Sequence, residues 1–353
     1  MKNVLKFLTF SLLFALITTS CSDDKDDVLP PVVSLGDYEN GIIVSAEGGP
    51  ASISFISNDF SVTENNVYEN VNGEAPGVYL QSIGFNDDKG YIVSDNVNII
   101  NVVNRYTFEN EGAVTAGLQT PRYIDFANGK GYVSNWGDGT DANDDFIAVI
   151  NLATNAVETT IPVGEGPERV LANNGKIYVS HKGGWGNNNI VSVIDVSTNA
   201  VATITVGDVP DELFFNSAGE LVVLSEGKAA WTGDETAASI SKIDVSTNTV
   251  VETLTFANGE HPGQMAFDNG TIYYVLNNGV YEMPETAAAL PTAAVIDLGA
   301  INTYGLAVSN ENIYVTDAKD FFSAGDLLVY SIDSGNLVDT FVVGVNASKI
   351  YFN

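Results

Sequence analysis

The sequence contains very little cysteine and histidine. Its single cysteine, Cys21, excludes an intramolecular disulfide, and its two histidines, His181 and His261, do not cluster with carboxylates at the spacing of a zinc or copper site. As isolated histidines, both are expected at the surface. A nucleophile-elbow motif and a phosphate-binding loop are also missing. We therefore expect no catalytic residues and no bound metal of these classes.

Positive charge is equally scarce. Lysine and arginine number 14 against 45 aspartates and glutamates, which gives a net charge of −31. Nucleic acids and anionic lipid surfaces need clustered basic residues, so neither is an expected partner. Long amphipathic periodicity is missing as well, whereas 33 glycines and many short runs rich in Val and Ile indicate an all-β protein.

Residues 1–20 differ in composition from the rest of the chain. Lys2 and Lys6 precede the apolar run 7–17, which is too short to span a bilayer. The run leads to the sequence ITTSC, which ends at Cys21 and resembles the lipobox of a bacterial lipoprotein signal peptide. The resemblance implies that Cys21 is lipidated and becomes the first mature residue. An ordinary secretory signal with an incidental cysteine is the alternative.

Residues 21–37 form an acidic, proline-containing stretch. Its segment 22–27 has the sequence SDDKDD, which cannot form a packed core and is typical of a solvated tether. The segment also resembles the acidic export signals of Bacteroidetes surface lipoproteins. The resemblance implies a protein that is anchored in the outer membrane only through the lipid on Cys21 and is exposed at the cell surface.

Residues 38–353 contain a repeat of four short apolar runs. In the clearest copy, within Pro167–Asp208, the runs are 169–172, 176–180, 190–196 and 200–206, each bounded by turn residues, which predicts a four-stranded antiparallel meander. The residue before the first run recurs at Leu80, Pro121, Pro167, Pro210, Pro262, Thr303 and Asn346. This spacing of about 40 to 50 residues is typical of one propeller blade per repeat.

The two ends of the chain supply the remaining blade. After Asn346 only one strand remains, 347–353, whereas strands 41–46, 51–57 and a third near 62–71 have no first strand before them. Pairing of the C-terminal strand with the N-terminal ones would leave no free sheet edge. We therefore predict an all-β, seven-bladed propeller of four-stranded antiparallel blades that is closed in this way. A propeller of this kind is expected to be a monomer.

The turns between third and fourth strands share a sequence pattern. They occur at 152–155, 195–199 and 244–248, where Asp, Ser or Thr can accept local backbone hydrogen bonds and Asn tolerates positive φ. Together with the sequence IYVS at 177–180, this pattern resembles the YVTN (YncE-like) β-propeller family over about residues 38–353. That family has many functions. It includes cobalamin-binding Bacteroidetes lipoproteins that cap TonB-dependent outer-membrane transporters.

The loops between second and third strands are expected on one face of the propeller. These loops are the longest, and they contain Trp136, Trp185 and Trp231, while the corresponding loop of the last full repeat contains Phe321 and Phe322. A single tryptophan of this kind can simply cap the blade below it. Several such aromatic residues on one face indicate a binding surface for a ligand or partner.

The starts of the first strands should surround the mouth of the central channel on the same face. The predicted mouth positions are Gln81, Arg122, Glu168, Asp211, Gly263, Tyr304 and Ala347, followed one residue later by Tyr123, Arg169, Glu212 and Gln264. Arginines opposite carboxylates could form a ring that recognises polar groups of a ligand. The alternative is a set of mutual salt bridges that closes the hub.

The segment 138–145 offers several oxygen ligands. Asp138, Asp141 and Asp144 have spacings that could hold calcium, but the segment lacks the full EF-hand pattern and its final glutamate. A solvated acidic loop is the favoured interpretation, and we expect no cofactor.

These observations predict a surface lipoprotein that binds a ligand on the tryptophan-bearing face. The tryptophans would supply stacking area, while Arg122, Arg169 and Lys182 would contact anionic groups. The resemblance suggests a corrinoid or similar nutrient and a TonB-dependent transporter as partner. The predicted ligand-binding residues are Trp136, Trp185, Trp231, Arg122, Tyr123, Glu168, Arg169, His181, Lys182, Asp211, Tyr304, Phe321 and Phe322.

Two alternatives come from other functional classes. An adhesive or scaffolding propeller would bind protein or glycan through the same loops. A carboxylate-dependent lyase or hydrolase would need Glu168, Asp211 or Glu212 with a perturbed pKa in a closed pocket.

Overall fold

The computed structural model describes residues 34–353. The predicted signal peptide, the lipidation site Cys21 and most of the predicted tether lie outside the described residues. The segment Leu35–Asn353 is one compact unit. No helix within the described range has the length and apolar character needed to cross a bilayer.

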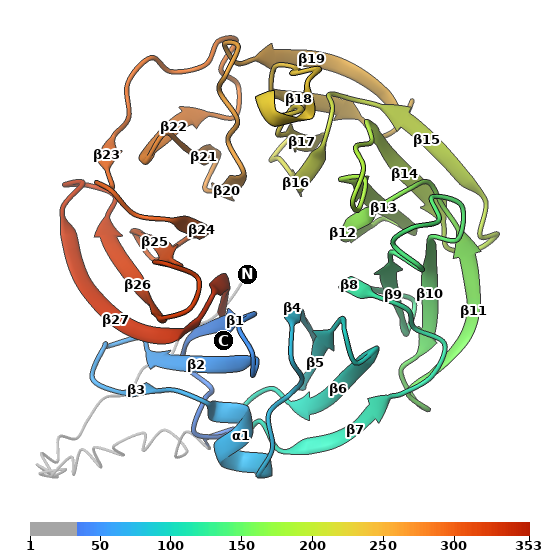
Figure 1. Ribbon diagram of the computed structural model, residues 1–353, viewed down its shortest axis with the longest axis vertical. Helices are drawn as coiled ribbons and strands as arrows, with labels where there is room; N and C mark the ends of the chain where they lie inside the picture. The colour runs from blue at the N-terminus through green and yellow to red at the C-terminus, as the bar shows by residue number, and fades with distance from the viewer. Residues whose placement is uncertain (1–33) are drawn as a thin grey trace, which may run out of the picture. The chain divides into compact units, whose positions relative to one another are not determined.

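The unit consists of seven four-stranded antiparallel sheets arranged around a central axis (Figure 1). The first sheet contains β28 (Ala347–Phe352), β1 (Gly41–Ala46), β2 (Ser52–Ser57) and β3 (Thr63–Glu64), in that order from the axis outward. The next two contain β4 (Leu80–Asn86), β5 (Lys89–Ser94), β6 (Ile99–Asn104) and β7 (Asn110–Val114), then β8 (Pro121–Ala127), β9 (Lys130–Asn135), β10 (Phe146–Asn151) and β11 (Ala156–Pro162).

The remaining sheets continue the same pattern. They contain β12 (Pro167–Asn173), β13 (Lys176–His181), β14 (Ile190–Asp195) and β15 (Val201–Thr205); β16 (Pro210–Phe215), β17 (Leu221–Ser225), β18 (Ser239–Asp244) and β19 (Thr249–Thr255); β20 (Gln264–Asp268), β21 (Thr271–Leu276), β22 (Gly279–Pro284) and β23 (Ile296–Asp297); and β24 (Thr303–Ser309), β25 (Asn312–Asp317), β26 (Ala324–Ser331) and β27 (Leu337–Val345). The predicted seven-bladed propeller is therefore confirmed.

The last strand closes the ring. β28 is the innermost strand of the first sheet and pairs antiparallel with β1, so that Ile350 lies opposite Val44. The predicted pairing of the C-terminal strand with N-terminal strands is thus confirmed. Because the first sheet contains strands from both ends of the chain, this pairing joins the two ends of the ring.

The hydrophobic core lies between neighbouring sheets. Each of seven buried clusters joins residues of two adjacent blades; one cluster, for example, packs Tyr91 and Val93 against Ile124 and Val133. Both faces of a blade are therefore apolar, which explains why its strands are rich in Val, Ile and Tyr. Five second strands carry a buried tyrosine at the same position: Tyr91, Tyr132, Tyr178, Tyr273 and Tyr314.

The outer strands differ most from prediction. The strand expected near 62–71, which is the outermost strand of the first sheet, is only Thr63–Glu64. It is followed by the short helix α1 (Val67–Asn72), whose Val67 and Tyr68 pack into the core. In the sixth blade, β22 continues to Pro284 and the outer strand β23 is only Ile296–Asp297. Outer strands have one neighbour, so their sequence is less restricted.

Candidate functional site

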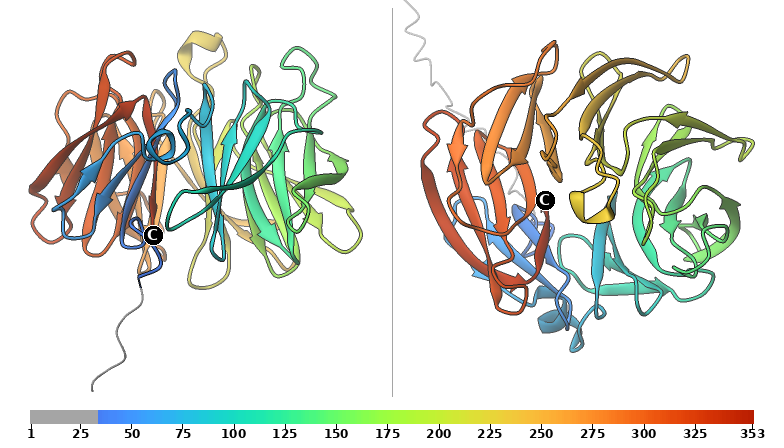
Figure 2. Two further views of the ribbon diagram at one scale, coloured as in Figure 1. Left: turned by 90° about the horizontal axis from the view of Figure 1, so that it is seen from below. Right: turned by 45° about the horizontal axis from the view of Figure 1, so that its top comes forward.

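The exposed aromatic side chains gather on one face. In residues 34–353, the Phe, Trp and Tyr side chains classed as exposed are Tyr79, Trp185, Trp231, Phe321 and Phe322. Tyr79 directly precedes a first strand, and the other four lie in loops between second and third strands. The short helix η1 (Ala230–Thr232), which carries Trp231, projects from this face, drawn in yellow in Figure 2. We call this surface the loop face.

Trp136 connects the loop face to the channel mouth. Its indole N–H donates to the Pro167 carbonyl at the start of β12, over 3.0 Å. The Arg122 guanidinium lies 4.0 Å from the centre of its ring, which is a cation–π contact. The Trp185 ring lies edge-on to it at 6.2 Å and is 83% exposed. Trp136 and Trp185 therefore form a continuous aromatic contact from the channel mouth to the solvent.

The mouth itself is closed by ion pairs. Arg122 donates two hydrogen bonds to Glu168, at 3.2 and 2.9 Å, and one to Asp95 at 3.3 Å. Asp95 also accepts from the side-chain amide of Gln81 at 3.0 Å. Glu168 is only 4% exposed. Because both acids are engaged by one arginine, this part of the mouth matches the salt-bridge alternative.

A second network continues around the mouth. Arg169 donates to Asp211 at 3.1 Å and also bonds Glu212. Lys182 bridges Asp211 at 2.9 Å and Glu226 at 2.7 Å. Burial opposes each charge, but the two neighbouring cations outweigh it at Asp211 and hold its pKa well below the usual range. At Glu226 burial dominates and raises the pKa to about 7.

Tyr304 brings the opposite side of the mouth into contact with the loop face. Its hydroxyl donates to Glu47 at 2.9 Å, and its ring meets Phe321 edge-on at 5.6 Å. Burial raises the pKa of Glu47. Glu47 lies in the loop between β1 and β2, which belongs to the same loop class as the tryptophan loops. The repeat pattern did not predict Glu47, Asp95 or Glu226 at the mouth. Each of these residues follows the end of a second strand.

One predicted ligand-binding residue does not reach the surface. His181 is fully buried, and its ring nitrogens lie 2.8 Å from the Ser192 hydroxyl and 3.2 Å from the Glu165 carbonyl. Burial lowers its pKa to about 4, so it is neutral at physiological pH. The expectation that His181 is a surface residue is therefore wrong. His261 is partly buried and contacts the Glu226 carbonyl at 2.7 Å.

The first strands begin with a bulge that aims side chains at the axis. Tyr123 and Arg169 donate their backbone N–H groups to Ser134 and Ser180 of the neighbouring strands, and in the first blade Lys349 lies opposite Ser45. By this register, Ala347 corresponds to Pro121, so the prediction of Ala347 at the mouth is wrong by one residue. The equivalent inner positions are Ser82, Tyr123, Arg169, Glu212, Gln264, Gly305 and Lys349.

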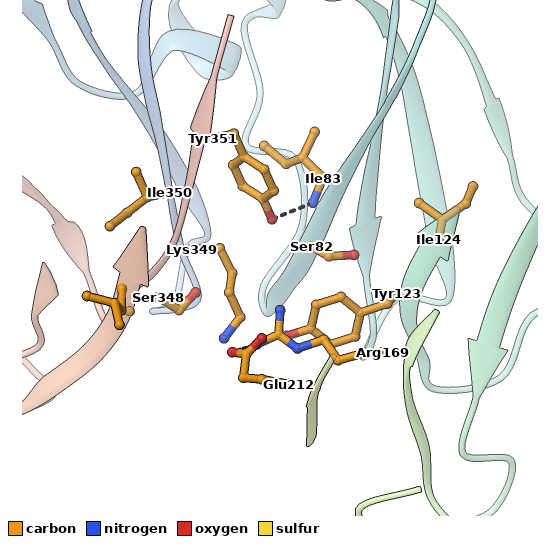
Figure 3. Close-up of a pocket in the computed structure, with 12 residues that line it drawn as sticks. Ser82, Ile83, Tyr123, Ile124, Arg169, Glu212, Ser348, Lys349, Ile350 and Tyr351 are labelled. Carbon is orange, nitrogen blue, oxygen red and sulfur yellow. Dashed lines mark hydrogen bonds and ion pairs between the residues drawn. The ribbon is translucent and has the colours of Figure 1, made fainter. Parts of the chain in front are cut away.

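All of these inner positions except Gln264 line a cavity of about 140 Å³. Arg169, Glu212, Tyr123 and Lys349 project into it from different blades (Figure 3). Deeper in the channel, the Tyr351 hydroxyl accepts a hydrogen bond from the Ile83 backbone N–H at 2.8 Å. The alignment of the internal repeats did not predict that Lys349 lines the channel. A correct register for the last strand, β28, would have placed it there.

Residues 138–143 of the acidic segment form an exposed loop with internal hydrogen bonds, whereas Asp145 is buried. Asp138 accepts from Thr140, and Asp141 accepts from Asn143. Between Ser34 and the C-terminus, no group of three or more His, Cys, Asp or Glu side chains is arranged to hold a metal ion.

The sequence matches one protein family. Residues 40–272 match the family described as a domain of unknown function, DUF5074. The chain belongs to this family. No curated protein matches the chain.

Solved structures share the fold of this DUF5074 protein. Hydrazine synthase of Kuenenia stuttgartiensis aligns with a TM-score of 0.60 at 17% identity, over 76% of this chain and 88% of that one. A computationally designed protein, Ika8, aligns at 0.59 and 11% identity, over 89% and 91%. The dihydro-heme d1 dehydrogenase NirN in complex with DHE aligns at 0.57 and 13% identity, over 91% and 77%. These similarities concern the fold alone.

Proposed function

We propose that this protein is a lipid-anchored surface protein that captures a bulky ligand on its loop face and delivers it to an outer-membrane transporter. The single observation that carries the proposal is the gathering on that face of all five aromatic side chains that are exposed within residues 34–353. Exposed apolar area rimmed by polar groups is typical of binding surfaces. Trp185, Trp231 and Phe322 are each more than 80% exposed, which is costly without a partner.

The arrangement favours a large ligand with a flat apolar part and polar edges. Trp185 lies beside Trp136, whereas Trp231 and Phe322 belong to separate blades, so one molecule that contacts all of them must span several loops. The ion-paired mouth lies between these loops and presents both charge signs at its rim. A corrinoid has a broad ring system with amide side chains, and the resemblance to cobalamin-binding propeller lipoproteins supports this ligand class.

The support for the lipid anchor and for the transporter partner comes from the sequence. The apolar run before Cys21 and the acidic stretch after it are the features of an exported lipoprotein. Delivery to a TonB-dependent transporter follows from the same resemblance. The carboxylate-dependent enzyme is not favoured, because Glu168, Asp211 and Glu212 are each bound by an arginine.

Isothermal titration calorimetry of the full chain tests the proposal. We expect cobalamin to bind saturably, and Trp185→Ala to weaken binding by roughly tenfold or more, as expected for a stacked aromatic hot spot. Val251→Ala is the matched control, since Val251 is an exposed apolar residue on the outer strand β19. Haem, ferric siderophores and oligosaccharides serve as comparison ligands.

Two results would contradict the proposal. Equal affinity of the Trp185→Ala variant and the parent chain would place the ligand elsewhere. An absence of heat with every compound would favour the adhesive or scaffolding alternative, with a protein partner on the same loops.

A further inference from the structure

The cavity on the propeller axis contains an ammonium group that makes no direct ion pair within the described residues. Among the lysine and arginine side chains of residues 34–353, Lys349 alone forms neither a hydrogen bond nor an ion pair. The nearest aromatic contact of its nitrogen is the Tyr304 ring, 6.0 Å away. Burial and the neighbouring Arg169 lower the pKa of Lys349, and they outweigh the opposite effect of the carboxylates of Glu212, Asp211 and Glu47. An unpaired charge in such a place is unfavourable unless something binds it.

Tyr123 presents a second unengaged donor to the same cavity. Its ring is fixed beneath the Arg169 guanidinium at 4.5 Å, but within the described residues nothing hydrogen-bonds its hydroxyl. Burial raises the pKa of Tyr123 well above its ordinary value, so the hydroxyl keeps its proton. Lys349 and Tyr123 come from the first and third blades and both point to the axis (Figure 3).

The lining offers Lys349 no direct ion pair. The lining residues include two cations, Arg169 and Lys349, and one carboxylate, Glu212. Glu212 and the neighbouring Asp211 are bound directly by Arg169, and Asp211 also by Lys182, so both carboxylates act on Lys349 only at longer range. A ligand carboxylate would supply the direct ion pair that Lys349 lacks.

The neighbours of Lys349 leave room for a small molecule. The inner positions on either side of it are Ser82 and Gly305, which have the smallest side chains of the ring. The volume of about 140 Å³ equals that of a few water molecules at about 30 Å³ each. The lining also includes Ile83, Ile124 and Ile350, together with Tyr351, whose hydroxyl accepts from the Ile83 backbone N–H. The cavity therefore suits a short chain with an anionic end and an apolar end.

We propose that this axial cavity binds a small monocarboxylate, with the Lys349 ammonium as its counter-ion and the Tyr123 hydroxyl as a second hydrogen-bond donor. The carboxylate faces the polar ring formed by Lys349 and Tyr123, and the carbon chain points toward the isoleucines. This site is separate from the aromatic side chains of the loop face and does not depend on the ligand bound there.

Saturation-transfer NMR with the full chain tests the proposal. The probes are sodium acetate, propionate and pyruvate at constant ionic strength, with inorganic phosphate as a competitor. We expect saturable transfer to the methyl protons of the carboxylates. Lys349→Met should weaken binding at least tenfold, and Tyr123→Phe, which keeps the ring beneath Arg169, should weaken it severalfold. Phosphate at equal concentration should not displace the carboxylates.

Lys130→Met is the matched control, because Lys130 forms an exposed ion pair with Glu158 on an outer part of its blade. It should bind the carboxylates like the parent chain, and so should Trp185→Ala, which separates this site from the loop face. Absence of transfer in the parent chain, unchanged binding in Tyr123→Phe and Lys349→Met, or displacement by phosphate would each overturn the proposal. If Lys349→Met does not fold, Tyr123→Phe decides the outcome alone.

Discussion

The two faces of the propeller differ in the connections between their strands. On the face opposite the loop face, first and second strands are joined by tight turns such as Asn128-Gly129, Asn174-Gly175 and Asn269-Gly270, in which both residues have positive φ. These are the residues that two-residue hairpin turns require. On the loop face, the connections are longer, differ between blades and contain every exposed aromatic residue of the described chain.

This difference distinguishes the connections that the fold requires from those that are longer than the fold requires. The tight turns satisfy strand twist and backbone geometry, so the same residue types recur in blade after blade. The loops that carry Trp185, Trp231 and Phe322 exceed what is needed to connect two strands, and they expose apolar area. Long loops on a rigid scaffold are where binding residues are usually found. Substitutions on the two faces should therefore have different consequences.

The largest expected effect concerns the mouth beneath the loop face. Arg122→Met leaves Glu168 and Asp95 without their counter-ion, and the loss of one partner of a buried ion pair costs about 3–5 kcal/mol. We expect this loss in the free energy of unfolding, measured by urea denaturation. Ligand binding should weaken too, since Arg122 supports the Trp136 ring.

Two comparisons make this result specific. Arg122→Met combined with Glu168→Gln should recover part of the lost stability, because one uncompensated charge is removed. Lys130→Met breaks an exposed pair, which solvent screens, and should cost far less stability than Arg122→Met. Equal losses for Arg122→Met and Lys130→Met would show that the mouth is not a buried network.

The next effect concerns His181, which ends β13 at the base of the Trp185 loop. Its pKa is about 4 in the folded chain against an ordinary value of 6.5. The unfolded chain therefore takes up a proton first, so the contribution of His181 to stability is complete above about pH 6.5 and is lost as the pH falls toward 4. The shift corresponds to about 3 kcal/mol.

We expect the free energy of unfolding to fall more steeply with acidification in the parent chain than in His181→Asn. Denaturation curves at several pH values between neutral and about 4 measure this difference. His261→Asn, at a partly exposed site, is the control and should follow the parent chain. Parallel curves for the parent chain and His181→Asn would contradict the burial of a neutral His181.

The smallest effect is expected on the face opposite the loop face. Asn199 adopts φ 58° in the turn between β14 and β15, a conformation that costs a β-branched residue about 1–2 kcal/mol. Asn199→Val should lower stability by that amount, whereas Asn199→Gly should not. Neither substitution should alter ligand affinity in calorimetry. A change in affinity would show that the two faces are not functionally separate.

The sequence was sufficient for the parts of the fold that repeat. The positions before the first strands predicted the starts of β4, β8, β12, β16 and β24 to within one residue. The positive φ of Asn155, Asn199 and Asn248 confirms the turn chemistry inferred from their pattern. These features could be predicted because each blade obeys the same local rules of strand alternation and turn geometry.

The features that could not be predicted depend on contacts between blades. The partners of Arg122 are Asp95 and Glu168, which belong to the blades on either side of it. The register of β28 depends on its pairing with β1, far away in sequence, and this register decides that Lys349 points to the axis. Burial of His181 likewise follows from packing between loops. None of these has a local sequence signature.

Hydrogen–deuterium exchange of the full chain with and without cobalamin tests the central claim most directly. The account predicts that cobalamin slows exchange in the loops 182–189, 226–238 and 318–323 and leaves the turns at 128–129, 174–175 and 269–270 unchanged. Protection confined to the turn face, or equal exchange in all loops at saturating cobalamin, would contradict it.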